Sequence, residues 1–211
     1  MAPRALTVLQ PGTVQMHLSM AGAWTATMLQ RLEAARLATP RLQPDTFQAF
    51  GDAMATVLAF YLALSHTLEV TRRAPWLDSV PMDPDALGEL HRKAERFRDM
   101  FMHFSDKDER EIDWGPIPWS PGPYDGRRPK IRMATSSGLG FEDGQAWLYA
   151  PPDQHSTTRE STRLSWSSME QASRAIEVWT LDLLNRWAEV QKRWAPYVEA
   201  HGHQLRTHLD S

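Results

Sequence analysis

The sequence predicts a mainly α protein, an up-and-down four-helix bundle with a proline-rich loop and a small β-hairpin insert before the last helix. In four segments of the 211-residue chain, apolar residues recur at three- and four-residue steps, as they do in a helix that buries one face. Residues 115–123 hold prolines that exclude a helix, because proline lacks a backbone N–H and fixes φ. Short apolar runs on both sides of a turn sequence follow, and this pattern indicates a hairpin.

Two long helices are predicted at the N-terminal end of the bundle. The first runs from Thr13 to about Ala38 and ends before Pro40. Asp45 is the predicted N-cap of the second helix, because its carboxylate can accept hydrogen bonds from the unpaired N–H groups of a first turn. The second helix continues to Pro75 and is the most apolar of the predicted elements.

The third and fourth helices follow the same period. Asp85 is the predicted cap of the third helix, whose apolar face continues to Phe104. Ser167 and Glu170 form a capping-box pattern at the start of the last helix, and Pro196 is expected to kink or end it. The tryptophans along this last helix are expected to serve packing or a dimer interface.

Between the third and fourth helices the sequence loses its helical period. A short strand is predicted from Lys130 to Ala134, and two further short apolar runs, 139–141 and 146–150, flank a predicted turn at 142–145. The predicted organisation is an N-terminal extension (residues 1–12), a single helical domain (13–200) whose β insert spans about 128–165, and a flexible tail (201–211).

The composition narrows the classes of function and the expected location. The chain has no cysteine, which excludes disulfides, thiolate metal sites and a cysteine nucleophile and fits a reducing cytosol. The apolar stretch from Ala53 to Leu64 is far shorter than the ~20 residues of a membrane span. Residues 1–10 are too irregular for a signal peptide. We therefore expect a soluble cytoplasmic protein that does not enter the membrane.

The net charge of −3 provides no global basic field, so any contact with nucleic acid has to come from a local cluster of basic and aromatic residues. Trp119, Arg127, Arg128 and Lys130 lie in and after the proline-rich loop. Aromatic rings stack on unpaired bases and cations contact phosphates, so these four are candidate RNA-binding residues. The alternative is that the ring packs under the hairpin and the basic side chains project into solvent.

The most specific motif is Arg98, Asp99 and His103, near the end of the third predicted helix. An arginine supplies a permanent cation and a histidine a titratable imidazole, the groups that metal-free cleavage of a phosphodiester needs. Asp99 and His103 are four residues apart and share a helix face, so the carboxylate can orient the imidazole. In a regular helix Arg98 and His103 lie about 140° apart, so they converge on one phosphate only if the helix breaks or a second chain contributes.

The sequence of this segment, RDMFMHFSDKDER, resembles the motif of the HEPN superfamily. In that motif a polar residue commonly follows an arginine, and four to six residues separate the arginine from a histidine. Here four residues separate Arg98 and His103, and the resemblance extends from about Trp24 to Trp194. It implies a metal-independent endoribonuclease in which two motifs face each other across a homodimer and form one composite site. It also implies a role in a toxin–antitoxin or defence system, with an antitoxin as partner.

The resemblance assigns a role to each residue of the motif. His103 would act as general base or acid at the ribose 2′-hydroxyl and the leaving oxygen, Arg98 would hold the scissile phosphate and stabilise its developing charge, and Asp99 occupies the polar position. These three are the candidate catalytic residues. No cofactor and no metal site are predicted.

Two other interpretations of the same residues stay open. The charged end of the third helix could be an ordinary salt-bridged surface, and the chain a non-catalytic helical bundle that binds a nucleotide or a protein partner. A metal-binding bundle is less favoured: His91 and His103 on one helix ridge are about 18 Å apart and cannot share an ion. His17 and His66, on the first and second helices, could add ligands to such a site.

Overall fold

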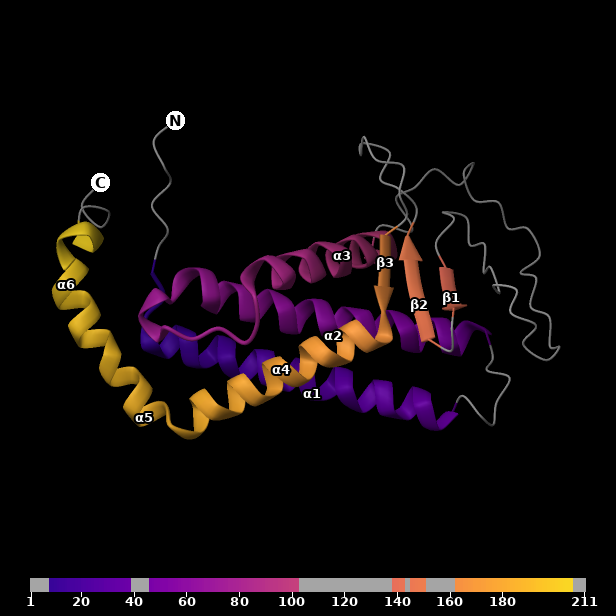
Figure 1. Ribbon diagram of the computed structural model, residues 1–211, viewed down its shortest axis with the longest axis horizontal. Coiled ribbons are helices and arrows are strands. Elements are labelled where there is room, and N and C mark those ends of the chain that lie inside the picture. The colour runs from indigo at the N-terminus through magenta and orange to yellow at the C-terminus, as the bar shows by residue number, and fades with distance from the viewer. Residues whose placement is uncertain (1–7, 39–45, 103–137, 143–144, 151–161, 207–211) are drawn as a thin grey trace, which may run out of the picture.

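The computed structural model describes residues 8–38, 46–102, 138–142, 145–150 and 162–206. Its main body consists of four long helices that lie along one another (Figure 1). They are α1 (Pro11–Ala38), α2 (Thr46–Arg73), α3 (Pro84–Met102) and α4 (Trp166–Asn185). The predicted mainly α class is confirmed.

Contacts between distant residues show how the helices run. The backbone N–H of Leu9 donates to the carbonyl of Arg73 at 2.7 Å, which joins the start of α1 to the end of α2. The Ser173 hydroxyl donates to the Met28 sulfur at 2.8 Å, so the later part of α1 lies beside the earlier part of α4. Arg98 of α3 contacts Tyr61 of α2, whereas His91, earlier in α3, lies 3.0 Å from Ser65, later in α2. Each of these pairs of helices is therefore antiparallel.

Helix α2 is the central and most apolar element. Phe60 and Leu64 are fully buried on its inner face, where they pack against α1, α3 and α4. Within the described residues, the segment Met54–Arg73 is long and apolar enough to cross a membrane, with a mean hydropathy of 1.3, and half of that window is buried inside the bundle. A core helix has the same length and composition, so these two properties do not assign a location.

Helix α3 begins two residues earlier than the sequence predicts. The carbonyl of Asp83 accepts the first helical hydrogen bond, from the N–H of Leu87 at 2.9 Å, and its side chain accepts from the N–H of Asp85. Asp83 is therefore the N-cap, and Asp85 lies in the first turn, so the predicted cap at Asp85 is wrong. Pro84 occupies the first helical position, where its missing N–H costs no hydrogen bond.

A small antiparallel sheet lies beside the bundle in strand order β1-β2-β3 (Figure 1). The strands are β1 (Gly138–Glu142), β2 (Gln145–Ala150) and β3 (Thr162–Ser165). Phe141 pairs with Ala146 across β1 and β2, and Leu148 pairs with Leu164 across β2 and β3. Strand β3 leads directly into α4 and buries Leu164 in the bundle core. The strand predicted at 130–134 lies outside the described residues.

The cap of α4 differs from the prediction. The Ser165 hydroxyl accepts a hydrogen bond from the N–H of Ser168 at 3.1 Å, while the Ser165 backbone is extended. Ser165 is therefore the N-cap, and Ser167, predicted to cap the helix, lies in its first turn. Sequence spacing alone favoured Ser167, because only that serine has a glutamate three residues later.

The last predicted helix is divided. After α4, Arg186 leaves the helical conformation (φ −110°, ψ 27°), and the chain continues as α5 (Trp187–Val190), a 3₁₀ turn η3 (Gln191–Arg193) and α6 (Trp194–Arg206). Helix α6 turns away from the bundle (Figure 1). The sequence predicts that Pro196 kinks or ends the last helix; the interruption is the 3₁₀ turn η3 just before it, and Pro196 itself lies in the first turn of α6, where proline is tolerated. Helix α6 continues to Arg206, past the predicted domain end at 200.

The described residues form two apolar core clusters. The larger lies among α1, α2, α3, α4 and β3, and its bulkiest members include Phe60, Phe97 and Met169. The second lies at the end opposite the sheet, where Trp76 and Trp179 are buried and Trp194 packs against Trp76 at a ring-centroid distance of 5.7 Å. Trp76 and Trp179 thus serve packing within the chain.

Candidate functional site

The structure describes part of the predicted catalytic motif. Arg98 and Asp99 lie near the end of α3, and its last residue is Met102. His103, the next residue, lies outside the described residues, as do the candidate RNA-binding residues Trp119, Arg127, Arg128 and Lys130. The site is therefore built here from Arg98, Asp99 and the side chains that surround them.

The amphipathic pattern of α3 places both residues at the edge of the bundle. Phe97, directly before them, is 1% exposed and points into the core. Successive residues of a helix are rotated by about 100°, so Arg98 and Asp99 emerge beside the buried stripe. The side chain of Arg98 is 27% exposed and that of Asp99 is 49% exposed. A guanidinium in this position can contact both a neighbouring helix and solvent.

Arg98 binds groups on its own helix with one edge of its guanidinium. Its Nε donates to Oδ1 of Asp99 at 2.9 Å, and its Nη2 donates to the same oxygen. Oε1 of Glu95, one turn earlier, lies 3.5 Å from Nη2. Arg98 is thus neutralised by carboxylates from α3.

The remaining edge of Arg98 contacts α2. Its Nη1 donates to the hydroxyl of Tyr61, and its guanidinium carbon lies 4.4 Å from the centroid of the Tyr61 ring. This contact combines a hydrogen bond with a cation–π interaction. The contact links two helices, since 37 positions separate the two residues in the chain.

Tyr61 is in turn held by His91 and Ser65. The His91 ring stacks on Tyr61 with centroids 5.1 Å apart and planes inclined by 29°. The Ser65 hydroxyl donates to the carbonyl of Tyr61 at 2.8 Å and lies 3.0 Å from Nε2 of His91. We refer to this set as the α2–α3 polar cluster, and its members are Tyr61, Ser65, His91, Glu95, Arg98 and Asp99.

Burial and nearby charges shift the pKa values of Arg98 and His91. Burial alone would lower the pKa of Arg98, but the hydrogen bond to Asp99 and electrostatic attraction to Tyr61, Asp99 and Glu95 outweigh it, so this pKa is raised. Burial lowers the pKa of His91, and the cations Arg72 and Arg98 lower it further, against the opposing effect of Glu95. Neutral His91 is thereby favoured beside the Arg98 cation.

The arrangement can bind an oxyanion. An arginine edge that donates two N–H groups to one carboxylate oxygen can donate the same groups to phosphate oxygens. Asp99 occupies that edge here, whereas the sequence predicts that Asp99 orients His103. Because His103 lies outside the described residues, its orientation stays a prediction.

The alternative metal site depends on the histidines of the bundle helices. The described part of the chain contains no group of three or more His, Asp or Glu side chains placed to hold a metal ion. The Nδ1 atoms of His17 and His66 are 2.9 Å apart, and their ring centroids are 5.1 Å apart. The two nitrogens therefore point toward each other along the line between the rings. This is the geometry of a shared hydrogen bond, not of two ligands that converge on a third atom.

The sequence did not identify Tyr61, Ser65 and His91 as neighbours of Arg98. Tyr61 fits the apolar face of the second predicted helix, so its hydroxyl was not considered as a polar partner. One signal was available: Tyr61 and Ser65 are four residues apart, and His91 and Arg98 are seven apart, so each pair lies on one helix face. The pairing of these two faces depends on the tertiary structure.

A comparison with protein-family models found no match, and neither a search of curated proteins nor a search of solved structures found a similar chain.

Proposed function

We propose that this protein is a HEPN-like, metal-independent endoribonuclease with Arg98, Asp99 and His103 in a composite site of a homodimer. The observation that carries the proposal is the position of Arg98. Its guanidinium is held at the bundle surface with an anion-binding edge on a carboxylate, five residues before the histidine of the motif. Arg98 therefore supplies the phosphate contact that the proposed chemistry needs.

The proposal includes the finer architecture of the fold. The four long helices form an up-and-down bundle, and the proline-rich loop with the small sheet is an insert between its third and fourth helices. The antiparallel contacts of α1 with α2, α2 with α3 and α1 with α4 support this topology. In such a bundle the motif lies late in the third helix, as the HEPN resemblance requires.

The proposed reaction is attack of a ribose 2′-oxygen on the adjacent phosphorus. His103 takes the proton of the 2′-hydroxyl, and the partner subunit's His103 gives a proton to the departing 5′-oxygen. A bond forms between the 2′-oxygen and phosphorus while the bond to the 5′-oxygen breaks. Arg98 holds the phosphate and stabilises the charge that develops on its oxygens.

The partners and setting of the protein follow from the same proposal. Trp119, Arg127, Arg128 and Lys130 bind the RNA strand by stacking and by phosphate contacts. The protein acts in the cytoplasm as the toxin of a toxin–antitoxin or defence system, and an antitoxin partner blocks the site.

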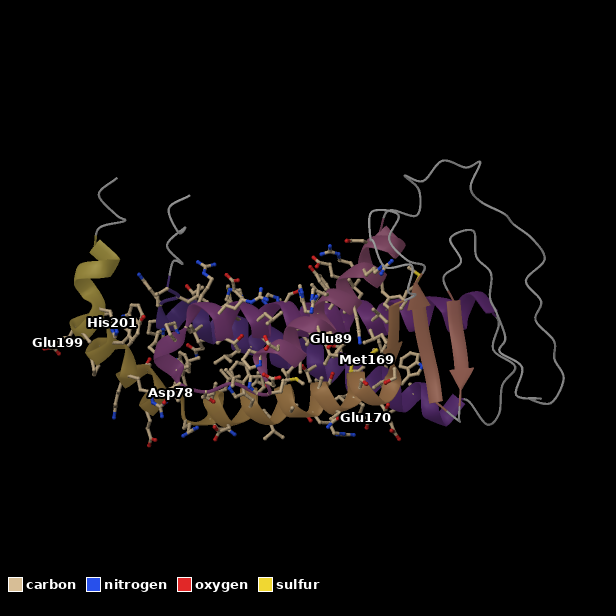
Figure 2. The ribbon with its side chains drawn as sticks, turned by 45° about the horizontal axis from the view of Figure 1, so that its top comes forward. Asp78, Glu89, Met169, Glu170, Glu199 and His201 are labelled. Atoms are coloured by element: carbon tan, nitrogen blue, oxygen red, sulfur yellow. The ribbon has the colours of Figure 1, made fainter. Side chains whose placement is uncertain are left out.

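The test is cleavage of a mixed RNA substrate in EDTA by the wild type and by His103→Ala. His201→Ala is the matched control, because His201 lies on α6 at the end opposite the sheet (Figure 2). Circular dichroism and thermal unfolding establish that all three proteins are equally folded. We expect cleavage by the wild type and His201→Ala and loss of cleavage in His103→Ala. Equal cleavage by all three would remove His103 from the reaction.

One observation favours a second function. Arg98 pairs with Asp99 and Glu95 of its own helix, which is also the pattern of a salt-bridged surface helix. In that case the chain is a non-catalytic helical bundle that binds a nucleotide or a protein partner. Absence of cleavage by every variant in the same assay, with folded protein, would favour this alternative.

A further inference from the structure

We propose that Asp99 is an internal competitor for the phosphate of RNA, and that Tyr61 is a positioning residue that keeps Arg98 in place when RNA displaces Asp99. This inference rests on the proposed function, because it assumes that Arg98 contacts the scissile phosphate. It concerns the regulation of that contact. Neither role follows from the HEPN pattern, which contains no residue of α2.

The first argument is the edge of Arg98 that Asp99 occupies. Both Nε and Nη2 donate to one oxygen, Oδ1 of Asp99. Those two N–H groups form the side of the guanidinium that binds a phosphate with two parallel hydrogen bonds. A phosphate can therefore bind this edge only when Asp99 leaves it.

The second argument is that Asp99 can leave at small cost. Its side chain is 49% exposed, so the released carboxylate becomes hydrated. Adjacent residues of a helix do not normally face each other, so the pair depends on one conformation of two flexible side chains. An incoming phosphate also replaces the negative charge that Asp99 withdraws, and Arg98 stays neutralised throughout.

The third argument is that Tyr61 holds the opposite edge more firmly. The Tyr61 hydroxyl accepts from Nη1, which takes no part in the contact with Asp99, and the ring lies under the guanidinium carbon at 4.4 Å. Tyr61 belongs to another helix, and the ring of His91 stacks on it while Ser65 holds His91. Arg98 can thus exchange Asp99 for phosphate without losing its support from α2.

The neutral state of His91 fits this role of Tyr61. A protonated imidazole in the stack would place a second cation beside Arg98 and repel it. The groups that face His91 are Ser65 and Tyr61 of α2, Arg72 at the end of α2, and Glu95 and Arg98 of α3. Of these, only Glu95 favours the charged imidazole.

The experiment measures binding of a fluorescent RNA oligonucleotide in which every ribose is 2′-O-methylated, so that cleavage does not interfere. Affinity is read from fluorescence anisotropy for the wild type, Asp99→Asn and Arg98→Ala. The matched control is Asp182→Asn, because Asp182 of α4 is also a half-exposed aspartate, paired at 2.6 Å with Arg186, the residue that follows α4. This control corrects for the loss of one negative charge anywhere on the protein.

We expect Asp99→Asn to bind the oligonucleotide more tightly than Asp182→Asn by about threefold or more, the effect of removing a competing surface ion pair. Arg98→Ala should weaken binding and lower the dependence of affinity on salt by about one phosphate contact. In an Arg98→Ala background, Asp99→Asn should give no gain beyond that of Asp182→Asn, because the edge that Asp99 blocks is then missing.

Tyr61 is tested by two substitutions that divide its contacts. Tyr61→Phe keeps the ring and removes the hydrogen bond, whereas Tyr61→Leu removes both. We expect affinity to fall in the order wild type, Tyr61→Phe, Tyr61→Leu. The ¹⁵N NMR signal of Arg98 Nε gives a readout that a merely structural role does not move: its N–H should exchange with water fastest in Tyr61→Leu.

The outcomes separate this inference from the proposed function. Equal affinities of Asp99→Asn and Asp182→Asn, together with weakened binding by Arg98→Ala, would overturn the competitor role and leave the nuclease proposal standing. Unchanged binding and exchange in both Tyr61 variants would overturn the positioning role. If Arg98→Ala binds as the wild type does, Arg98 has no phosphate contact and both the inference and the proposed function fail at that residue.

Discussion

At the scale of single residues, His17 and His66 link α1 to α2 through one hydrogen bond between their Nδ1 atoms. Such a bond needs at least one neutral ring, because two protonated rings have no acceptor to offer each other. Burial lowers the pKa of His66, His17 lowers it further, and Glu69 opposes the shift. Burial also lowers the pKa of His91.

These pKa shifts predict that the protein loses stability in mild acid. The unfolded chain takes up protons near the ordinary histidine pKa of about 6.5, whereas His66 and His91 in the folded chain do so only at lower pH. The free energy of unfolding is therefore highest above that value and decreases as the pH falls through it toward the folded-state pKa values. Urea unfolding at pH values between about 7.5 and about 5, in steps of about half a pH unit, measures how the free energy of unfolding depends on pH.

A His66→Asn variant provides the control for this slope. It should show a weaker loss of stability over the same pH range, since one of the two histidines with a lowered pKa is gone. His201→Asn, on α6, should keep the wild-type slope. A slope of the opposite sign, or one that His66→Asn leaves unchanged, would contradict the assignment.

The candidate site shows which residue-level features the sequence can supply. The sequence identified Arg98 and Asp99, because their types and spacing are visible without any structure. It did not identify that Asp99 binds Arg98, since adjacent helical side chains are not expected to meet. Nor did it pair Tyr61 with Arg98, because that contact depends on how α2 and α3 pack.

At the scale of elements, the boundaries of α4 depend on hydrogen bonds that the sequence pattern does not resolve. Ser165, Ser167 and Ser168 all stand near its start, and each could cap a helix by residue type. Strand β3 decides between them, because it ends at Ser165 in the extended conformation that an N-cap requires. The sequence prediction missed β3 and so placed the cap two residues late.

The cap assignment predicts different costs for two similar substitutions. Ser165→Ala removes the acceptor for the N–H of Ser168 and should lower the free energy of unfolding by about 1 kcal/mol. Ser167→Ala, on an exposed position in the first turn, should change it by less than about 0.5 kcal/mol. Urea denaturation of the two variants and the wild type measures both values, and an equal or reversed order would contradict the cap at Ser165.

The number and order of the long helices were predictable because periodic apolar residues report burial directly. The division of the last helix was not. The residues from Trp179 to Trp194 keep a helical apolar spacing, yet the chain leaves the helix at Arg186 and re-enters it within one residue. Packing of Trp187 and Trp194 around Trp76 accompanies this bend, and that packing is a long-range property.

At the scale of the whole molecule, the proposed function requires two chains. On a regular helix Arg98 and His103 are separated by about 140°, so the two side chains of one chain do not converge on one phosphate. In a composite site between two motifs, the groups that meet can come from different chains. The two proposed catalytic groups would then come together from the ends of two α3 helices. The dimer is thus part of the proposed chemistry.

We predict that the protein in solution has twice the 24.1 kDa mass of the chain. Sedimentation velocity over a range of protein concentrations gives the mass and shows whether activity follows the dimer. Cleavage that rises with the dimer fraction is the expected result. A monomer that cleaves RNA at full rate would contradict the composite site.

The most direct test of the central claim is the chemistry of the RNA ends that the wild type produces in EDTA. Attack by the 2′-oxygen predicts fragments with a 2′,3′-cyclic phosphate and a 5′-hydroxyl, no cleavage of 2′-O-methylated RNA, and a rate that falls by about 100-fold or more in Arg98→Ala. Arg186→Ala, at the residue that follows α4, should keep the wild-type rate. Fragments with 5′-phosphate ends, or equal rates for Arg98→Ala and the wild type, would contradict the account.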